Sequence, residues 1–138
     1  MLSALSRIGT GRADMADLTQ EEIKEIFWYN PLTGWLHWRK PSRPHLINRA
    51  AGSLEINKCH RTPYIRICYN RGRYYAHRLV WIYFNGPIPN GYEVDHKDRV
   101  GTNIFIWNLR LATRVENNLN REMPIRYKTA MKEYRVNQ

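Results

Sequence analysis

The chain has 138 residues, with 22 Lys and Arg against 12 Asp and Glu, for a formal net charge of +10. This length accommodates one domain with its own hydrophobic core. No run of about 18 apolar residues is present, which argues against a membrane span. The two cysteines, Cys59 and Cys68, form no C-x-x-C pair, so we expect no structural zinc.

Residues 1–17 are predicted to be a disordered lead, because this segment is weakly basic and rich in small residues and lacks the apolar run and cleavage site of a secretory signal. Thr19 and Glu22 then form a capping box, which predicts a helix reaching about Trp28. A turn over Asn30–Gly34 and a strand from Trp35 to Arg39 follow.

Residues 39–78 carry ten Lys and Arg against one acidic residue, Glu55, for a charge of +9. Each phosphate that such a surface neutralises releases condensed counterions, so a polyanion is the simplest partner. A basic surface without a special partner is the alternative, and the aromatic residues between the charges favour nucleic acid. Residues 51–56 predict a short strand, and the alternation of Tyr64–Tyr69 before Asn70–Gly72 predicts a β-hairpin.

The second half of the chain predicts a helix and then a strand–loop–strand–helix unit. The helix begins near His77, ends at Asn85-Gly86-Pro87 and buries a stripe of apolar residues. The stripe consists of Leu79, Val80, Tyr83 and Phe84. The unit consists of a strand over Tyr92–His96, a loop over 97–103, a strand over Ile104–Trp107 and a helix from the Thr113–Glu116 capping box to about Arg121. Residues 123–138 are expected to form a basic tail or helix.

This unit concentrates residues that suit phosphodiester hydrolysis. Asp95 offers hard oxygen ligands for a divalent cation. His96 has an ordinary pKa of about 6.5, which suits a general base. Asn108 and Asn117 follow at spacings of 12 and 9 residues. Alone, each has a simpler explanation, a turn residue for Asn108 and a helix-surface residue for Asn117 or Asn118, and only the joint pattern is specific.

The joint pattern resembles the HNH endonuclease family, in the Asp-His…Asn…Asn form of phage-type and free-standing homing-type nucleases. The resemblance extends upstream to Tyr29–Trp38, Ala76–Trp81 and Gly86–Pro89, and it covers roughly residues 19–121. It implies Asp95 and Asn117 as metal ligands. It also implies His96 as general base and Asn108 as the residue that ties down the loop.

The same resemblance implies one divalent cation, Mg²⁺ with Mn²⁺ able to substitute, and a structural role for His77. The five tryptophans are expected to pack rather than to stack on bases. One departure concerns the loop, because many relatives have Asp-Gly-Asp/Asn after Asp-His, whereas Arg99 stands at the glycine position and Gly101 follows two residues later. The arginines expected to contact DNA are Arg66, Arg71, Arg73, Arg78, Arg99, Arg110, Arg114 and Arg121.

The predicted fold is α+β, one compact domain from residue 18 to about 122. An N-terminal DNA-contacting region, 18–90, precedes a ββα-metal (His-Me finger) nuclease motif, 91–122. The expected function is cleavage of double-stranded DNA in the cytoplasm, that of the host cell if the protein is phage-encoded, with a homodimer or a phage protein partner compatible with it. The alternatives are a non-catalytic DNA-binding or assembly protein and an RNA-binding or ribosome-associated basic protein.

Overall fold

The computed structural model describes residues 17–56 and 62–122. These residues form a mixed α/β fold of helices and small antiparallel sheets, in agreement with the predicted α+β class. In chain order the elements are α2 (Gln20–Ile26), β1 (Phe27–Tyr29), β2 (Leu36–Trp38), the 3₁₀ helix η2 (Pro44–Leu46), β3 (Ser53–Glu55), β4 (Tyr64–Tyr69), β5 (Gly72–Tyr75), α3 (Ala76–Asn85), β6 (Tyr92–His96), the 3₁₀ helix η3 (Ile106–Asn108), β7 (Leu109–Thr113) and α4 (Arg114–Glu122).

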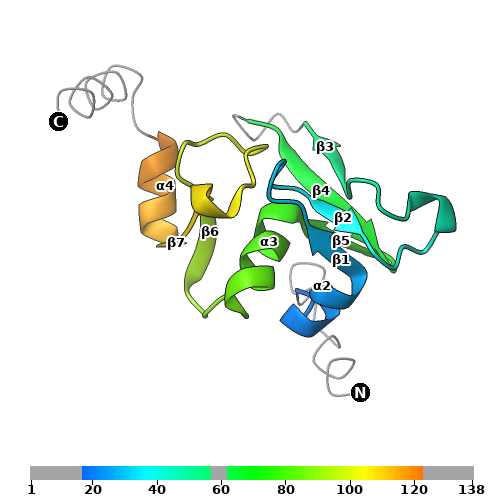
Figure 1. The fold of residues 1–138 in the computed structure, drawn as a ribbon. Helices are drawn as coiled ribbons and strands as arrows, with labels where there is room; N and C mark the ends of the chain where they lie inside the picture. The colour runs from blue at the N-terminus through cyan, green and yellow to red at the C-terminus, as the bar shows by residue number, and fades with distance from the viewer. Residues whose placement is uncertain (1–16, 57–61, 123–138) are drawn as a thin grey trace.

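Helix α3 occupies the centre of the molecule. Figure 1 shows β6, β7 and α4 on one side of α3, and the sheets β1–β2 and β3–β4–β5 on the other. Helix α3 packs against α2, β4, β5, β6 and η3. The strand–strand–helix unit at the C-terminal side is therefore held against the rest of the fold through α3.

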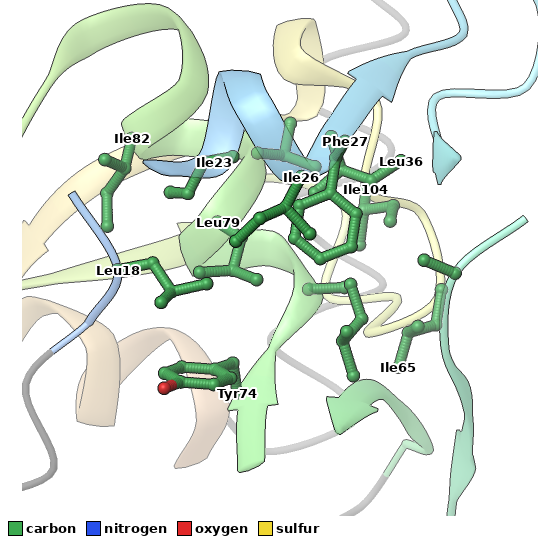
Figure 2. Close-up of a cluster of buried hydrophobic side chains, with 14 of the residues drawn as sticks. Leu18, Ile23, Ile26, Phe27, Leu36, Ile65, Tyr74, Leu79, Ile82 and Ile104 are labelled. Atoms are coloured by element: carbon green, nitrogen blue, oxygen red, sulfur yellow. The ribbon is translucent and has the colours of Figure 1, made fainter. Parts of the chain in front are cut away.

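One hydrophobic core joins these parts. Figure 2 shows side chains from α2, β1, β2, β4, β5 and α3 meeting there, together with Ile104 from the loop before η3. Ile23, Phe27, Leu36, Ile65 and Leu79 have no exposed surface. Burial of such side chains is the main favourable contribution to folding, at roughly 25 cal/mol per Å² of apolar surface.

The capping box at Thr19 and Glu22 is confirmed, since the Thr19 hydroxyl accepts from the Glu22 amide and the Glu22 carboxylate accepts from the Thr19 amide. The predicted end of this helix at Trp28 is wrong. Helix α2 ends at Ile26, and the three aromatic residues that follow form β1, which pairs with β2. Aromatic residues favour strands, and the antiparallel pairing with β2, Leu36–Trp38, overrides the helical spacing.

The β4–β5 hairpin is confirmed, with the two turn residues Asn70 and Arg71 in the left-handed region at φ 47° and 66°. Helix α3 also begins and ends as predicted, with Gly86 at its C-cap at φ 83°. Its buried stripe is partly different. Ile82 is also buried, because α3 packs against several elements, whereas Phe84 is 44 % exposed.

The predicted strand over Ile104–Trp107 is wrong. Ile104 is a buried core residue in a loop, η3 follows, and the strand that pairs with β6 begins only at Leu109. An apolar run without polar alternation does not distinguish a strand from a buried bend. Trp107 is 63 % exposed, so it does not pack in the core as expected.

The predicted N-terminal lead and C-terminal segment lie outside the described residues, except for Asp17, which forms an ion pair with Arg78. Leu18, the next residue, is buried in the core. Within residues 17–56 and 62–122, no helix has the length and apolar character needed to cross a bilayer.

Candidate active site

Strand β6 presents Asp95 and His96 to different neighbours. Asp95 is hydrogen-bonded to Arg110 of β7 and to Asn120 of α4. His96 contacts the rings of His77, at the start of α3, and Tyr64, at the start of β4. Adjacent residues of a strand point to opposite faces, so this division follows directly from the pleat. Both side chains are buried, with 6 % of Asp95 and 4 % of His96 exposed.

The Asp95 carboxylate is held through one oxygen. Its Oδ2 atom accepts from Arg110 Nε at 3.1 Å and from Asn120 Nδ2 at 2.9 Å. Arg110 Nη2 lies 3.0 Å from the same oxygen and completes an ion pair. Hydrogen bonds to ionised groups are stronger than neutral ones, so these contacts define the orientation of the carboxylate.

Asn117, one turn before Asn120 on α4, is oriented by Glu93. The Asn117 Nδ2 group donates to Glu93 Oε2. Glu93 lies two residues before Asp95 and therefore on the same side of β6. With its amide nitrogen engaged in this way, Asn117 retains its oxygen as a candidate cation ligand.

Asn108 organises the loop between β6 and η3. Its Nδ2 group donates to Asp98 Oδ1 at 2.9 Å and to the Asn103 carbonyl at 2.8 Å, and its Oδ1 atom accepts from the Asp98 amide at 3.2 Å. The Asn108 carbonyl also accepts from the Lys97 amide at 2.7 Å. A single side chain, 2 % exposed, thus contacts both ends of the loop.

Arg99 adopts the left-handed conformation, with φ 64°. Glycine enters this region without steric cost, which accounts for a glycine at the corresponding position of similar loops. The arginine keeps the same backbone conformation, and its Nε donates to Asn120 Oδ1 at 2.7 Å. Arginine in place of glycine therefore keeps the left-handed backbone conformation at position 99 and adds a side-chain contact with α4.

Gly101 lies against the segment before β4. Its amide donates to Thr62 Oγ1 at 3.1 Å. A Cβ atom at this position would lie 2.3 Å from the Pro63 carbonyl oxygen, a distance that backbone atoms do not tolerate. A glycine is thus required here by close approach of two backbone segments rather than by its φ angle.

The His96 imidazole is neutral at pH 7. Burial lowers its pKa from the ordinary 6.5, against opposing contributions from Asp95, Asp98 and a hydrogen bond with the Gly101 backbone. Its Nε2 atom is buried and has no hydrogen-bond partner among the described residues. A neutral imidazole whose second nitrogen is engaged by the Gly101 backbone has this Nε2 atom available to accept a proton.

His77 is also neutral and buried. Burial lowers its pKa well below 6.5, and the nearby His96 and Arg78 lower it further. Its ring centroid lies 4.5 Å from that of His96, and its Nδ1 atom has no partner in the described part of the chain. Tyr64 and Tyr75 complete a group of four rings.

Because the folded protein keeps His77 and His96 neutral, we expect its unfolding free energy to fall as the pH drops below about 6.5. The unfolded chain binds protons in this range that the folded chain excludes, so stability is present above the unfolded pKa and is lost below it. Each excluded proton changes the stability by about 1.4 kcal/mol per pH unit. Urea unfolding at about pH 7.5, 6 and 5 measures the dependence.

A His77→Phe variant provides the control for this pH dependence. Phenylalanine keeps an aromatic ring in the core and removes one titrating group, so the stability should fall less steeply with pH, by the equivalent of one proton. A pH dependence equal to that of the wild type would contradict the burial of a neutral His77.

These residues surround one open pocket of about 240 Å³. It lies where β6 and α4 meet α3, β4 and β5. Its lining includes Tyr64, Tyr75, His77, Arg78, Glu93, Asp95, His96 and Asn117. The fold therefore brings three of the predicted site residues, Asp95, His96 and Asn117, to one pocket. Asn108 does not line the pocket but supports the adjoining loop.

Sequence reasoning did not assign a role to Glu93 or Asn120. A signal for each was available, since Glu93 shares a strand face with Asp95 and Asn120 shares a helix face with Asn117. His77 was assigned a structural role, and its place in the pocket wall was not foreseen.

The arginines predicted to contact DNA fall into two groups. Arg71, Arg73 and Arg114 are exposed. Four others are engaged within the protein, Arg66 with Glu55 and the Tyr75 ring, Arg78 with Asp17, Arg99 with Asn120 and Arg110 with Asp95. The side chain of Arg121 lies outside those that the structure describes.

Comparison with known proteins relates the segment that holds this site to one family. Residues 74–119, from the end of β5 to α4, match the family model described as HNH endonuclease. This segment of the chain, which holds Asp95, His96, Asn108 and Asn117, is similar to the HNH endonuclease family.

One relative of the chain is a bacteriophage protein. Protein 3.8 of Escherichia phage T7 is 48 % identical over 48 residues, which make up 35 % of this chain and 40 % of that protein. The chain thus spans about two fifths of the length of this relative. No solved structure matches the chain.

Proposed function

We propose that the protein is a divalent-metal-dependent endonuclease that hydrolyses phosphodiester bonds of double-stranded DNA. The observation that carries this proposal is the convergence of Asp95, His96 and Asn117 on one pocket within the HNH segment. The strand pair β6–β7 followed by α4 is interpreted as a ββα-metal (His-Me finger) unit.

The donor set in the pocket fits a hard cation. Asp95 and Asn117 would hold it through a carboxylate and an amide oxygen, the ligand types that Mg²⁺ and Mn²⁺ accept. The contacts described above engage Asp95 Oδ2 and Asn117 Nδ2, so Asp95 Oδ1 and Asn117 Oδ1 are the remaining donors. The Arg110 guanidinium neutralises part of the local negative charge, so we expect weak metal binding until DNA phosphate oxygens add further ligands.

When bound, a divalent cation would supply positive charge to the scissile phosphate and to the 3′-oxygen that leaves. His96 would accept a proton from the attacking water through Nε2, since its imidazole is neutral at pH 7. Attack at phosphorus and departure of the 3′-oxygen would leave 5′-phosphate and 3′-hydroxyl ends. Asn108 would act indirectly, by supporting the loop whose Gly101 backbone bonds His96.

The β4–β5 hairpin would contact the DNA backbone. Arg73 shares its strand face with Tyr75, a pocket residue, and pairs with Cys68 on β4. Exposed arginines at 71 and 73 therefore extend from the pocket along the hairpin. Such contacts would position the duplex without reading its sequence.

One site of this kind cuts one strand, so a double-strand break would require two copies of the protein or two successive nicks. The similarity to a phage protein supports action in the cytoplasm of an infected host cell. A homodimer or a second phage protein would then be the natural partner.

Incubation with supercoiled plasmid and Mg²⁺ or Mn²⁺ tests the proposal. We expect nicked or linear DNA, and no product when EDTA removes the metal. Plasmid that shifts in mobility but remains uncut with either metal would support the non-catalytic DNA-binding function instead. Preferential retention of RNA by the purified protein would support an RNA-binding function.

A further inference from the structure

We propose that Asn120 is a positioning residue that orients the Asp95 carboxylate for a cation and links it to loop 97–103 through Arg99. This inference rests on the proposed function, because it concerns the same metal site. It assigns a role to a side chain that does not line the pocket, and to the arginine that replaces the usual loop glycine.

The Asn120 side chain bonds at both ends. Its Nδ2 group donates to Asp95 Oδ2 at 2.9 Å, and its Oδ1 atom accepts from Arg99 Nε at 2.7 Å. The amide orientation follows from chemistry, since a guanidinium only donates and a carboxylate only accepts. Asn120 therefore forms a defined bridge between the loop and the metal-binding carboxylate.

The bridge and Arg110 together determine which oxygen of Asp95 remains for a ligand. Three donor atoms, two from Arg110 and one from Asn120, converge on Oδ2. These contacts do not involve Oδ1, which is left as the oxygen for a cation. Partners that orient a metal ligand in this way commonly change metal affinity by 10- to 100-fold when they are removed.

The bridge also connects two halves of the site. Arg99 lies three residues after His96 in the loop, and its amide donates to the His96 carbonyl at 3.0 Å. Asn120 lies one helical turn after Asn117, the second proposed ligand. A displacement of α4 would therefore move the contacts of Asp95, the Asn117 side chain and the loop together.

The neighbouring Asn118 offers a matched control. It has the same side chain and lies on the same helix, but its side chain is exposed and contacts neither Asp95 nor Arg99. Asn118→Ala should reproduce the general effect of an Asn-to-Ala change on the surface of α4 while leaving the contacts of Asp95 in place.

The test is Mn²⁺ binding by isothermal titration calorimetry, without DNA, for wild type, Asn120→Ala, Arg99→Ala and Asn118→Ala. We expect Asn120→Ala to weaken Mn²⁺ affinity by about tenfold or more and Asn118→Ala to leave it within about twofold of wild type. Arg99→Ala should also weaken affinity. The double variant should be no weaker than Asn120→Ala, since both act through one contact.

Thermal melting checks that each variant is folded, and Arg99→Ala carries the test if Asn120→Ala does not fold. Equal Mn²⁺ affinity of wild type and Asn120→Ala would overturn the positioning role, even if the wild type cleaves plasmid. Weakened binding in a protein that never cleaves DNA would support the positioning role and overturn the nuclease. A wild type that binds no Mn²⁺ without DNA would overturn the positioning role, whereas the plasmid assay alone decides the nuclease, because DNA phosphate oxygens are expected to add ligands.

Discussion

Replacement of His96 by alanine should reduce plasmid cleavage by about 10²- to 10⁴-fold, the usual contribution of a general base. His96 is the pocket imidazole with an unpartnered Nε2 atom and a hydrogen bond from its ring to the Gly101 backbone. Because alanine leaves the exposed arginines of the β4–β5 hairpin in place, DNA affinity should stay close to that of the wild type. Initial cleavage rates and a gel-shift titration at fixed salt measure the two quantities.

His45→Ala is the matched control for this variant, because His45 is exposed and lies in η2, outside the pocket lining. It should cleave at the wild-type rate. Cleavage by His96→Ala at that same rate would show that another group accepts the proton, and His77, the other imidazole of the pocket, would be the first to replace.

Gly101→Ala should destabilise the protein by about 1–3 kcal/mol, the usual cost of forcing extra atoms into a packed site. The added Cβ would lie 2.3 Å from the Pro63 carbonyl oxygen, so loop 97–103 and the segment before β4 must separate. Separation would disturb the backbone contact that orients His96, so cleavage should fall together with stability. Urea unfolding and initial cleavage rates report the two effects.

Gly91→Ala is the control for Gly101→Ala, because it introduces backbone strain without a steric clash. Gly91 has φ 86°, and a Cβ there would meet nothing within 4 Å. Its replacement should cost about 1 kcal/mol through the left-handed conformation alone and leave cleavage intact. If Gly101→Ala were as stable and active as the wild type, the close approach of loop and β4 segment would be disproved.

The elements that were predicted correctly are those whose signals are local. Each capping box joins residues three apart, at Thr19–Glu22 and again at Thr113–Glu116, and both form as expected. The β4–β5 hairpin follows from strict alternation next to a tight turn. In these cases the hydrogen-bond partners are neighbours in sequence, so spacing alone identifies them.

The errors arise where a distant partner decides the conformation. Phe27 continues an apolar pattern of helical spacing, yet its backbone pairs with Trp38 in a strand. Ile104 begins an apolar run that resembles a strand, yet it serves as a core residue in a loop. Trp107 ends the same run and is largely exposed. Packing against other elements overrides local preference at Phe27 and Ile104, whereas Trp107 lies in η3 and outside the strands.

The sequence alone determined the chemistry that is available, since the types and spacing of Asp95, His96, Asn108 and Asn117, and the basic charge of residues 39–78, are properties of the chain itself. Only the tertiary structure decided how that chemistry is arranged. It placed Asn120 and Arg110 on one oxygen of Asp95, Glu93 on Asn117 and His77 beside His96. These partners come from different elements, and hydrogen bonds between distant residues form only after packing has brought the elements together. Spacing places Glu93 and Asn120 on the same faces as Asp95 and Asn117, but it does not reveal which side chains pair across elements.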